Sequence, residues 1–173
     1  MNTFRRALSL WTLPLAVLGT ACTPAGQHDS AGELREALDH HQITALIDRL
    51  GRALDEGRFD ELRAIYTADA TAQTPGGIAE GRDALITQAR RNHSADQRIQ
   101  HLISNVMVDI RGDAADVRAN LVATFAPAAP AGAIAAPQFT LGEIYRFDAV
   151  RTAQGWRLSR VQTTPLWSTG TRP

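Results

Sequence analysis

Apolar residues recur along the first third of the chain with the period of a helix. Spacings of three and four residues link five of them: Ile43, Leu46, Ile47, Leu50 and Leu54. This spacing predicts an amphipathic helix with one buried face. Asp39 and Gln42 form a capping-box pattern that predicts its start, and Gly57 predicts its end. Residues 33–38 are expected to form either a separate helical turn or the beginning of a longer helix.

Two shorter helices are predicted after the first. Asp60 is expected to cap one that carries Leu62, Ile65 and Tyr66, and Gly81 opens the other. A Pro-Gly-Gly turn between them separates two short apolar runs, which are expected to pair as short strands.

Beyond these helices the apolar pattern changes to that of strands. Four long strands are predicted, at residues 99–110, 116–126, 139–150 and 156–167. The segment between the middle two, residues 127–137, consists mostly of Ala, Pro and Gly, and is expected to be either a mobile lid over an apolar mouth or a plain insertion. Helices followed by antiparallel strands predict an α+β domain with its helices on one face of the sheet.

The strand at residues 99–110 carries a histidine and an asparagine where a plain core strand would carry Val or Ile. Alternation predicts that His101, Ile103, Asn105 and Met107 share one face, unless a β-bulge changes the count. An imidazole titrates near neutral pH, so His101 is the main candidate for proton transfer. The alternative is that His101 is a structural residue of the core, which forms a hydrogen bond with a neighbouring group and has no catalytic role.

Composition excludes several classes of function. The 173 residues include 18 basic and 18 acidic side chains, so no broad positive field is available for nucleic acid. No His-x-x-x-His pair, cysteine cluster, phosphate-binding glycine loop or Ser-His-Asp arrangement occurs. We therefore expect neither a metal nor a cofactor.

The N-terminus has the features of an export signal. Residues 1–21 combine a basic start, an apolar stretch too short for a membrane span, and small residues before the single cysteine, Cys22. This resembles a bacterial lipoprotein signal, in which Cys22 is acylated and provides the only membrane attachment, although plain secretion fits as well. The expected organisation is a signal peptide at 1–21, a tether at 22–38, a domain at 39–168 and a tail at 169–173.

Several short motifs in this order resemble the SnoaL-like branch of the nuclear transport factor 2-like superfamily. They lie at residues 53–57, 68–71, 81–86, 101–106 and 155–158. The resemblance implies a cone-shaped, curved antiparallel sheet wrapped around about three N-terminal helices, with an apolar pocket for a small hydrophobic molecule. It also implies that the outer sheet face can pair in a homodimer.

The site residues of this family carry over only in part. In its dehydratases, an Asp and a Tyr of the first helix face a strand His, and these positions correspond to Asp55, Leu50 and His101. Leu50 cannot donate a hydrogen bond. The general base of ketosteroid isomerase falls near Thr74, which cannot act as one, whereas its protonated carboxyl falls near Glu143. Close equivalence to that isomerase is therefore rejected.

Other polar and aromatic residues are candidates for binding a ligand. Glu143 shares its strand face with apolar neighbours, so it is either buried with a raised pKa or exposed near the 127–137 segment. The amide of Asn120 could donate a hydrogen bond to a ligand in the pocket, or it could form a hydrogen bond with a backbone group. Tyr66 and Trp167, like Leu50, could line the pocket or serve only in packing.

The leading hypothesis is an exported, cofactor-independent lyase or isomerase. His101 would transfer a proton and Asp55 would orient it, on a small and largely apolar substrate. The alternative is a cell-envelope module without catalysis, which binds a ligand or a protein or forms a dimer.

Overall fold

The computed structural model describes residues 26–172, with side chains from residue 30 onward. The predicted signal peptide at 1–21, the acylation site at Cys22 and the first residues of the tether lie outside this range. The described residues form two α-helices, a 3-10 helix and one six-stranded sheet.

The first helix, α1, is continuous from Gly26 to Asp55. The predicted start at Asp39 is therefore wrong. Residues 33–38 are mostly strong helix formers, so the helix extends through them. The side chain of Asp39 is buried and accepts hydrogen bonds from Arg151 and Trp156 instead of capping the helix.

The predicted end of α1 is confirmed. Gly57 has a φ of +66°, and its N–H donates to the carbonyl of Leu54. The N–H of Arg58 donates to the carbonyl of Ala53, which completes the hydrogen-bond pattern of a Schellman motif. Asp55 is thereby held at the last turn of the helix, with the chain turning away after it.

The second predicted helix is shorter than expected. It is the 3-10 helix η1 (Phe59–Ala64), and its N-cap is Arg58, without a side-chain capping bond. Asp60 lies inside it and pairs with Arg90 at 2.7 Å rather than capping. Tyr66 starts the first strand instead of ending this helix.

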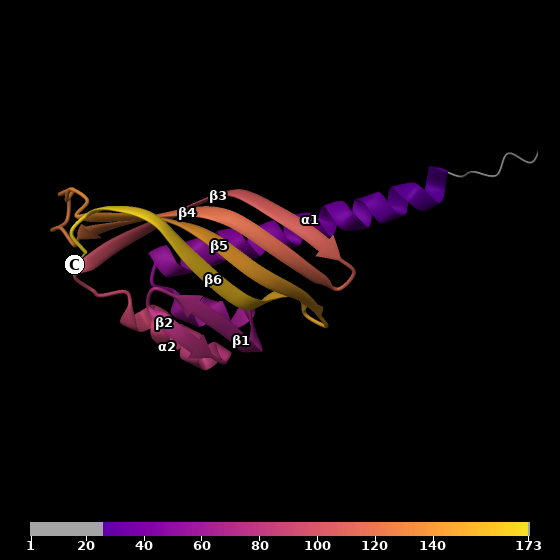
Figure 1. Ribbon diagram of the computed structural model, residues 1–173, viewed down its shortest axis with the longest axis horizontal. Helices are drawn as coiled ribbons and strands as arrows, with labels where there is room; N and C mark the ends of the chain where they lie inside the picture. The colour runs from indigo at the N-terminus through magenta and orange to yellow at the C-terminus, as the bar shows by residue number, and fades with distance from the viewer. Residues whose placement is uncertain (1–25, 173) are drawn as a thin grey trace, which may run out of the picture.

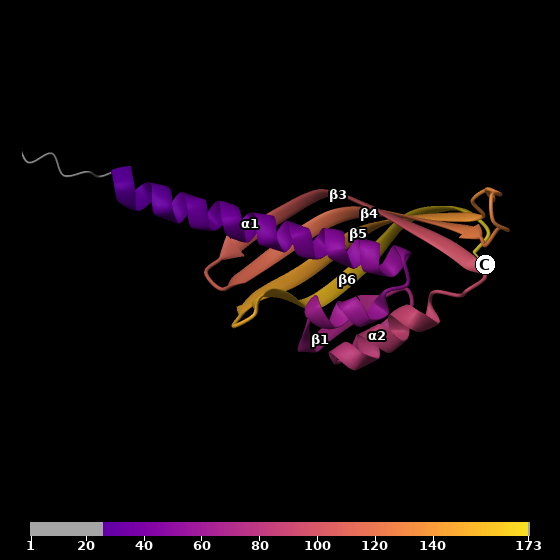
Figure 2. The same cartoon turned by 180° about the vertical axis from the view of Figure 1, so that it is seen from behind.

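The strands are ordered β2-β1-β6-β5-β4-β3 in one curved, open sheet. Their bounds are β1 (Tyr66–Thr74), β2 (Gly77–Glu80), β3 (Gln97–Arg111), β4 (Ala114–Pro127), β5 (Phe139–Thr152) and β6 (Gly155–Gly170), with helix α2 (Arg82–Arg91) between β2 and β3. All neighbours are antiparallel except β1 and β6, which are parallel. Figure 1 shows the long strands, and Figure 2 shows α1 across the concave face of the sheet. The α+β prediction is confirmed.

A β-bulge interrupts β3. The register with β4 shifts between Ser104 and Met107, and Asn105 has a φ of +52°. The shift reverses the alternation beyond it. His101 and Ile103 face the core, but after the bulge Val106 does so, while Asn105 is exposed and Met107 is 64% exposed. The prediction that Asn105 and Met107 share the face of His101 is wrong.

The core lies between α1 and the concave face of the sheet. Small and branched side chains alternate along β4 and face inward: Ala115, Val117, Ala119, Leu121 and Ala123. They meet the apolar stripe of α1, whose members Ile43, Leu46, Ile47 and Leu50 are at most 2% exposed. The alanines allow the helix to lie close to the sheet.

Residues 30–38, near the start of α1, lie outside this core. Every side chain from residue 30 to residue 38 is exposed. The helix runs past the edge of the sheet there (Figure 1). Among the described residues, no helix is both long enough and apolar enough to span a membrane.

Candidate active site

A cavity of about 160 Å³ opens where α1 ends, between the concave face of the sheet, η1 and α2. Most of its wall is apolar, including Leu50, Leu54, Leu62 and Leu121. A cavity of about 150 Å³ accommodates a benzene-sized molecule. The space therefore suits a molecule of about one ring.

His101 lines this cavity and pairs with Asp55, which lies outside the cavity lining and borders a neighbouring hollow that His101 also borders. The Nδ1 of His101 lies 2.6 Å from Oδ1 of Asp55, and the backbone N–H of His101 donates to the same oxygen at 2.9 Å. The side chain of His101 is 9% exposed and that of Asp55 is 26% exposed. One carboxylate oxygen thus fixes both the strand and the imidazole ring.

This geometry determines which nitrogen of His101 can accept a proton. A carboxylate only accepts hydrogen bonds, so Nδ1 carries the proton that faces Asp55. In the neutral ring Nε2 then has a free lone pair. An imidazole oriented in this way by a carboxylate is the arrangement of a general base.

Glu143 lies on the same cavity wall, from β5. It is 6% exposed, and its Oε1 is buried without a hydrogen-bond partner among the described residues. Burial raises the pKa of Glu143 above its ordinary value, and the nearby hydroxyl of Thr163 and the charges of His101 and Arg172 offset this only in part. Burial without a partner favours the neutral acid, which can donate a hydrogen bond.

Two tyrosines add further donors to the cavity. Tyr66 of β1 and Tyr145 of β5 are 5% and 7% exposed, and both line the cavity. Burial raises the pKa of each phenol, so both stay protonated. Period-two spacing from Glu143 places Tyr145 on the same strand face, but no motif singles it out as a site residue.

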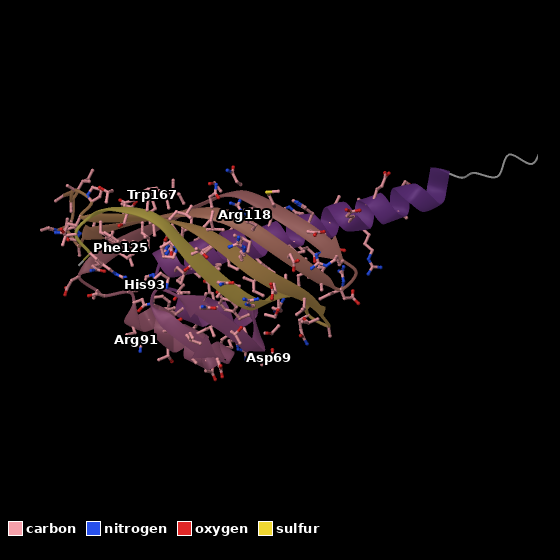
Figure 3. The ribbon with its side chains drawn as sticks, viewed as in Figure 1. Asp69, Arg91, His93, Arg118, Phe125 and Trp167 are labelled. Atoms are coloured by element: carbon pink, nitrogen blue, oxygen red, sulfur yellow. The ribbon has the colours of Figure 1, made fainter. Side chains whose placement is uncertain are left out.

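His93 is a second histidine of this cavity that the sequence analysis did not select. It follows α2 in a polar segment, and nothing in that pattern predicts a buried position. Its ring centroid lies 6.0 Å from that of His101 and 5.2 Å from that of Phe59. Figure 3 shows it between the sheet and α2.

The remaining sequence candidates divide into two groups. Leu50 and Tyr66 line the cavity, as does Thr74. Asn120 and Trp167 are not among the residues that line it, so of the two alternatives given for each, the structure does not place them in the pocket. Asn120 lies between the inward-facing Ala119 and Leu121, so alternation turns it to the outer face.

Trp167 is displaced for a related reason. It is paired with Gly142, whose neighbours Leu141 and Glu143 both line the cavity, so Gly142 faces outward. The indole lies where a Cβ of Gly142 would be, and it is 50% exposed. Trp167 therefore covers the outside of the sheet (Figure 3).

Within residues 26–172, no three His, Cys, Asp or Glu side chains are grouped so that they could hold a metal ion. The polar groups at the cavity are instead an imidazole–carboxylate pair, a buried carboxyl group, two phenols and a second imidazole. They can exchange protons and hydrogen bonds with a small molecule.

Comparison with known structures gives the same fold. Kfla4162 from Kribbella flavida matches with a TM-score of 0.69 at 24% identity, over 78% of this chain and 95% of its own. A type 2 hexachlorocyclohexane dehydrochlorinase (LinA) matches with a TM-score of 0.67 at 15% identity, over 82% of this chain and 97% of its own. These identities establish likeness of fold alone.

Sequence comparison extends the match to a family. An uncharacterized protein of Mycobacterium tuberculosis is 34% identical over 128 residues, which cover 72% of this chain and 84% of that protein. The model of the SnoaL-like domain matches residues 35–162, a range that contains both Asp55 and His101. The chain belongs to the SnoaL-like domain family, whose nuclear transport factor 2-like fold it adopts.

Proposed function

We propose that this protein is a cofactor-independent lyase or isomerase that acts on a small, largely apolar molecule of about one ring. One observation carries the proposal: His101 lines an apolar cavity together with the buried Glu143, and its Nδ1 lies 2.6 Å from Asp55. A relative in fold is named a dehydrochlorinase, an enzyme of elimination, and this supports the same reaction class.

The proposed chemistry is loss of water from a β-hydroxy ketone. Nε2 of His101 takes a proton from the carbon between the carbonyl and the carbon that bears the hydroxyl. The electron pair of that C–H bond forms the C=C bond, and the C–O bond to the hydroxyl breaks. Neutral Glu143 donates a proton to the departing oxygen, so water leaves, and the proton on His101 restores Glu143 through solvent. In a ketone without a leaving group only the first step can occur, and the carbon-bound proton then exchanges with solvent.

Two probes test the proposal without knowledge of the natural substrate. Cyclohexanone in D₂O reports proton abstraction by the loss of its α-proton NMR signals, and 3-hydroxycyclohexanone reports dehydration by the absorbance of its enone. We expect His101→Ala to slow both by roughly 10²–10⁴-fold. Asp55→Asn should also slow both, because the oriented tautomer is lost. His41→Ala, at an exposed position of α1, is the matched control.

The opposite result is clear in the same assays. If the wild-type protein accelerates neither reaction beyond the rate of the His101→Ala variant, the proposed activity is refuted.

A second candidate function is binding without turnover, and Leu50 favours it. Leu50 is buried and lines the cavity where the family's dehydratases carry a tyrosine. Saturable binding of cyclohexanone together with no proton exchange would support this alternative. Tyr66 and Tyr145 argue against this alternative, because they supply phenols to the same cavity from β1 and β5.

Export remains a proposal from the sequence. It rests on the signal-like pattern at residues 1–21 and on Cys22. Expression of the full chain and of Cys22→Ala, followed by detergent partition of the mature protein, separates acylation from plain secretion. Acylation places only the protein with Cys22 in the detergent phase.

A further inference from the structure

The proposed reaction leaves His93 without a role, although it lies in the same cavity as His101. It follows the last turn of α2, and its ring packs edge-on against Phe59. His93 lies outside the family motifs given above, and it takes no part in the proton transfer described for His101 and Glu143.

The hydrogen bond of His93 fixes its tautomer. Its Nδ1 lies 2.7 Å from the carbonyl oxygen of Ala89, one turn back on α2. A carbonyl only accepts, so Nδ1 carries a proton. Burial lowers the pKa of His93, so the ring is neutral at pH 7 and Nε2 is a hydrogen-bond acceptor.

This acceptor is unsatisfied. Nε2 of His93 is buried and has no hydrogen-bond partner among the described residues. Buried polar atoms of native proteins are nearly always paired, so an exception calls for an explanation. The two ring nitrogens diverge, so Nε2 faces away from Ala89, and the ring lines the cavity.

We propose that His93 is a substrate-binding residue, and that its Nε2 accepts a hydrogen bond from a hydroxyl or amino group of the substrate. This rests on the proposed function only in taking the cavity as the substrate site. It adds a substrate class: a one-ring molecule that carries an O–H or N–H donor, beside the carbonyl that the phenol of Tyr66 or Tyr145 would contact.

The selectivity that follows is asymmetric. A molecule with a donor pairs the orphaned nitrogen, whereas a purely apolar molecule of the same shape leaves it unpaired. Sites built to hydrogen-bond a hydroxyl reject analogues that lack it more strongly than apolar pockets reject small differences in size.

Phenol and toluene test this selectivity, because they have nearly the same shape and differ in one hydroxyl. We expect phenol to bind about tenfold more tightly than toluene, as measured by titration. In ¹⁵N NMR spectra of the imidazole nitrogens, only phenol should shift the Nε2 signal of His93 in the direction of hydrogen-bond acceptance.

Two variants separate this role from a structural one. In His93→Asn the amide nitrogen takes roughly the place of Nδ1, so the bond to Ala89 can persist while Nε2 is lost. In His93→Gln the terminal amide reaches roughly the place of Nε2. We expect phenol and toluene to bind His93→Asn about equally, and His93→Gln to regain part of the preference for phenol.

The inference is overturned if His93→Asn keeps the preference for phenol. It is also overturned if saturating phenol leaves the His93 signal unmoved, or if phenol does not bind at all. None of these measurements needs turnover. Phenol bound through His93 in a protein that exchanges no protons would refute the proposed activity alone. If the protein exchanges protons of cyclohexanone but phenol leaves the ¹⁵N signal of His93 unchanged, this inference alone is refuted.

Discussion

At the scale of single residues, a carboxyl group in an apolar wall couples the chemistry of the cavity to stability. Glu143 is buried, and Oε1 finds no partner in the described part of the chain. An acid in such a place favours its neutral form, and every proton lost from it costs folding free energy.

Replacement of Glu143 by Gln should therefore stabilise the protein in a pH-dependent way. Burial raises the folded-state pKa of Glu143 above 4.5, its ordinary value. Below 4.5 both folded and unfolded chains hold the proton. As the pH rises from there through the folded-state pKa, only the unfolded chain loses it readily, so wild-type stability falls.

Urea unfolding at pH 4, 6 and 8 measures this effect. We expect the free energy of unfolding of Glu143→Gln, relative to wild type, to rise over this series. Glu36→Gln, at an exposed position of α1, should show no such rise. A difference between Glu143→Gln and wild type that does not change with pH would contradict an uncharged, buried Glu143.

At single residues, a motif could indicate which side chains lie together, but the sequence could not indicate burial that depends on distant packing. The family motifs indicated His101 and Asp55, and the structure brings the two within hydrogen-bond distance. His93 lies in a polar segment, and it is half-buried because Phe59 packs against its ring and the ring lines the cavity. No local pattern contains that information.

At the scale of elements, β3 shows how one backbone conformation redirects a strand. Alternation alone would place Asn105 beside His101 on the inner face. The bulge reverses the faces beyond Ser104, so that Val106 rather than Asn105 faces the core. Sequence periodicity cannot reveal a bulge that is fixed by the partner strand.

The positive φ of Asn105 makes this bulge testable. Asn tolerates the left-handed region better than branched residues do, and here the side chain is exposed. We expect Asn105→Val to lower the free energy of unfolding by about 1–2 kcal/mol and Asn105→Gly to leave it nearly unchanged. Ser104→Val, at the neighbouring exposed position, is the control and should be tolerated. Equal stability of the two Asn105 variants would argue against the left-handed conformation.

The attachment of α1 to the β5–β6 hairpin is also an element-scale feature. Arg151 donates to both carboxylate oxygens of Asp39, at 2.7 and 2.5 Å, and Trp156 Nε1 donates at 3.0 Å. The hydrogen bond from Arg151 is the main cause that lowers the pKa of Asp39 from 3.8 to about 2. The stabilisation is therefore present above pH 3.8 and is lost as the pH falls through about 2.

We expect Asp39→Asn to lower the free energy of unfolding by about 3 kcal/mol at pH 7, because a buried partner of Arg151 loses its charge. The deficit should shrink towards pH 2. Asp113→Asn removes the other, largely exposed partner of Arg151 and should cost less than about 1 kcal/mol. Urea unfolding measures both losses. Equal decreases in the free energy of unfolding for the two variants would show that burial does not distinguish the two contacts.

At the scale of the whole molecule, the order and type of most elements could be predicted, but the distances between them could not. Helical and strand periods predict α1, α2 and the four long strands. The parallel pairing of β1 with β6 joins segments about ninety residues apart, and no local pattern encodes it. The same holds for the cavity, whose volume depends on how far α2 and η1 stand from the sheet.

The two ends of the described chain lie at opposite ends of the molecule. Arg172 contributes to the cavity wall, whereas the exposed start of α1 projects from the far end (Figure 1). A purification tag or fusion partner attached after residue 173 would lie close to the cavity wall, and one attached ahead of α1 would lie far from it. Immobilisation on a sensor surface ahead of α1 would keep the end of the molecule that carries Arg172 away from the support, so small molecules could approach that end freely.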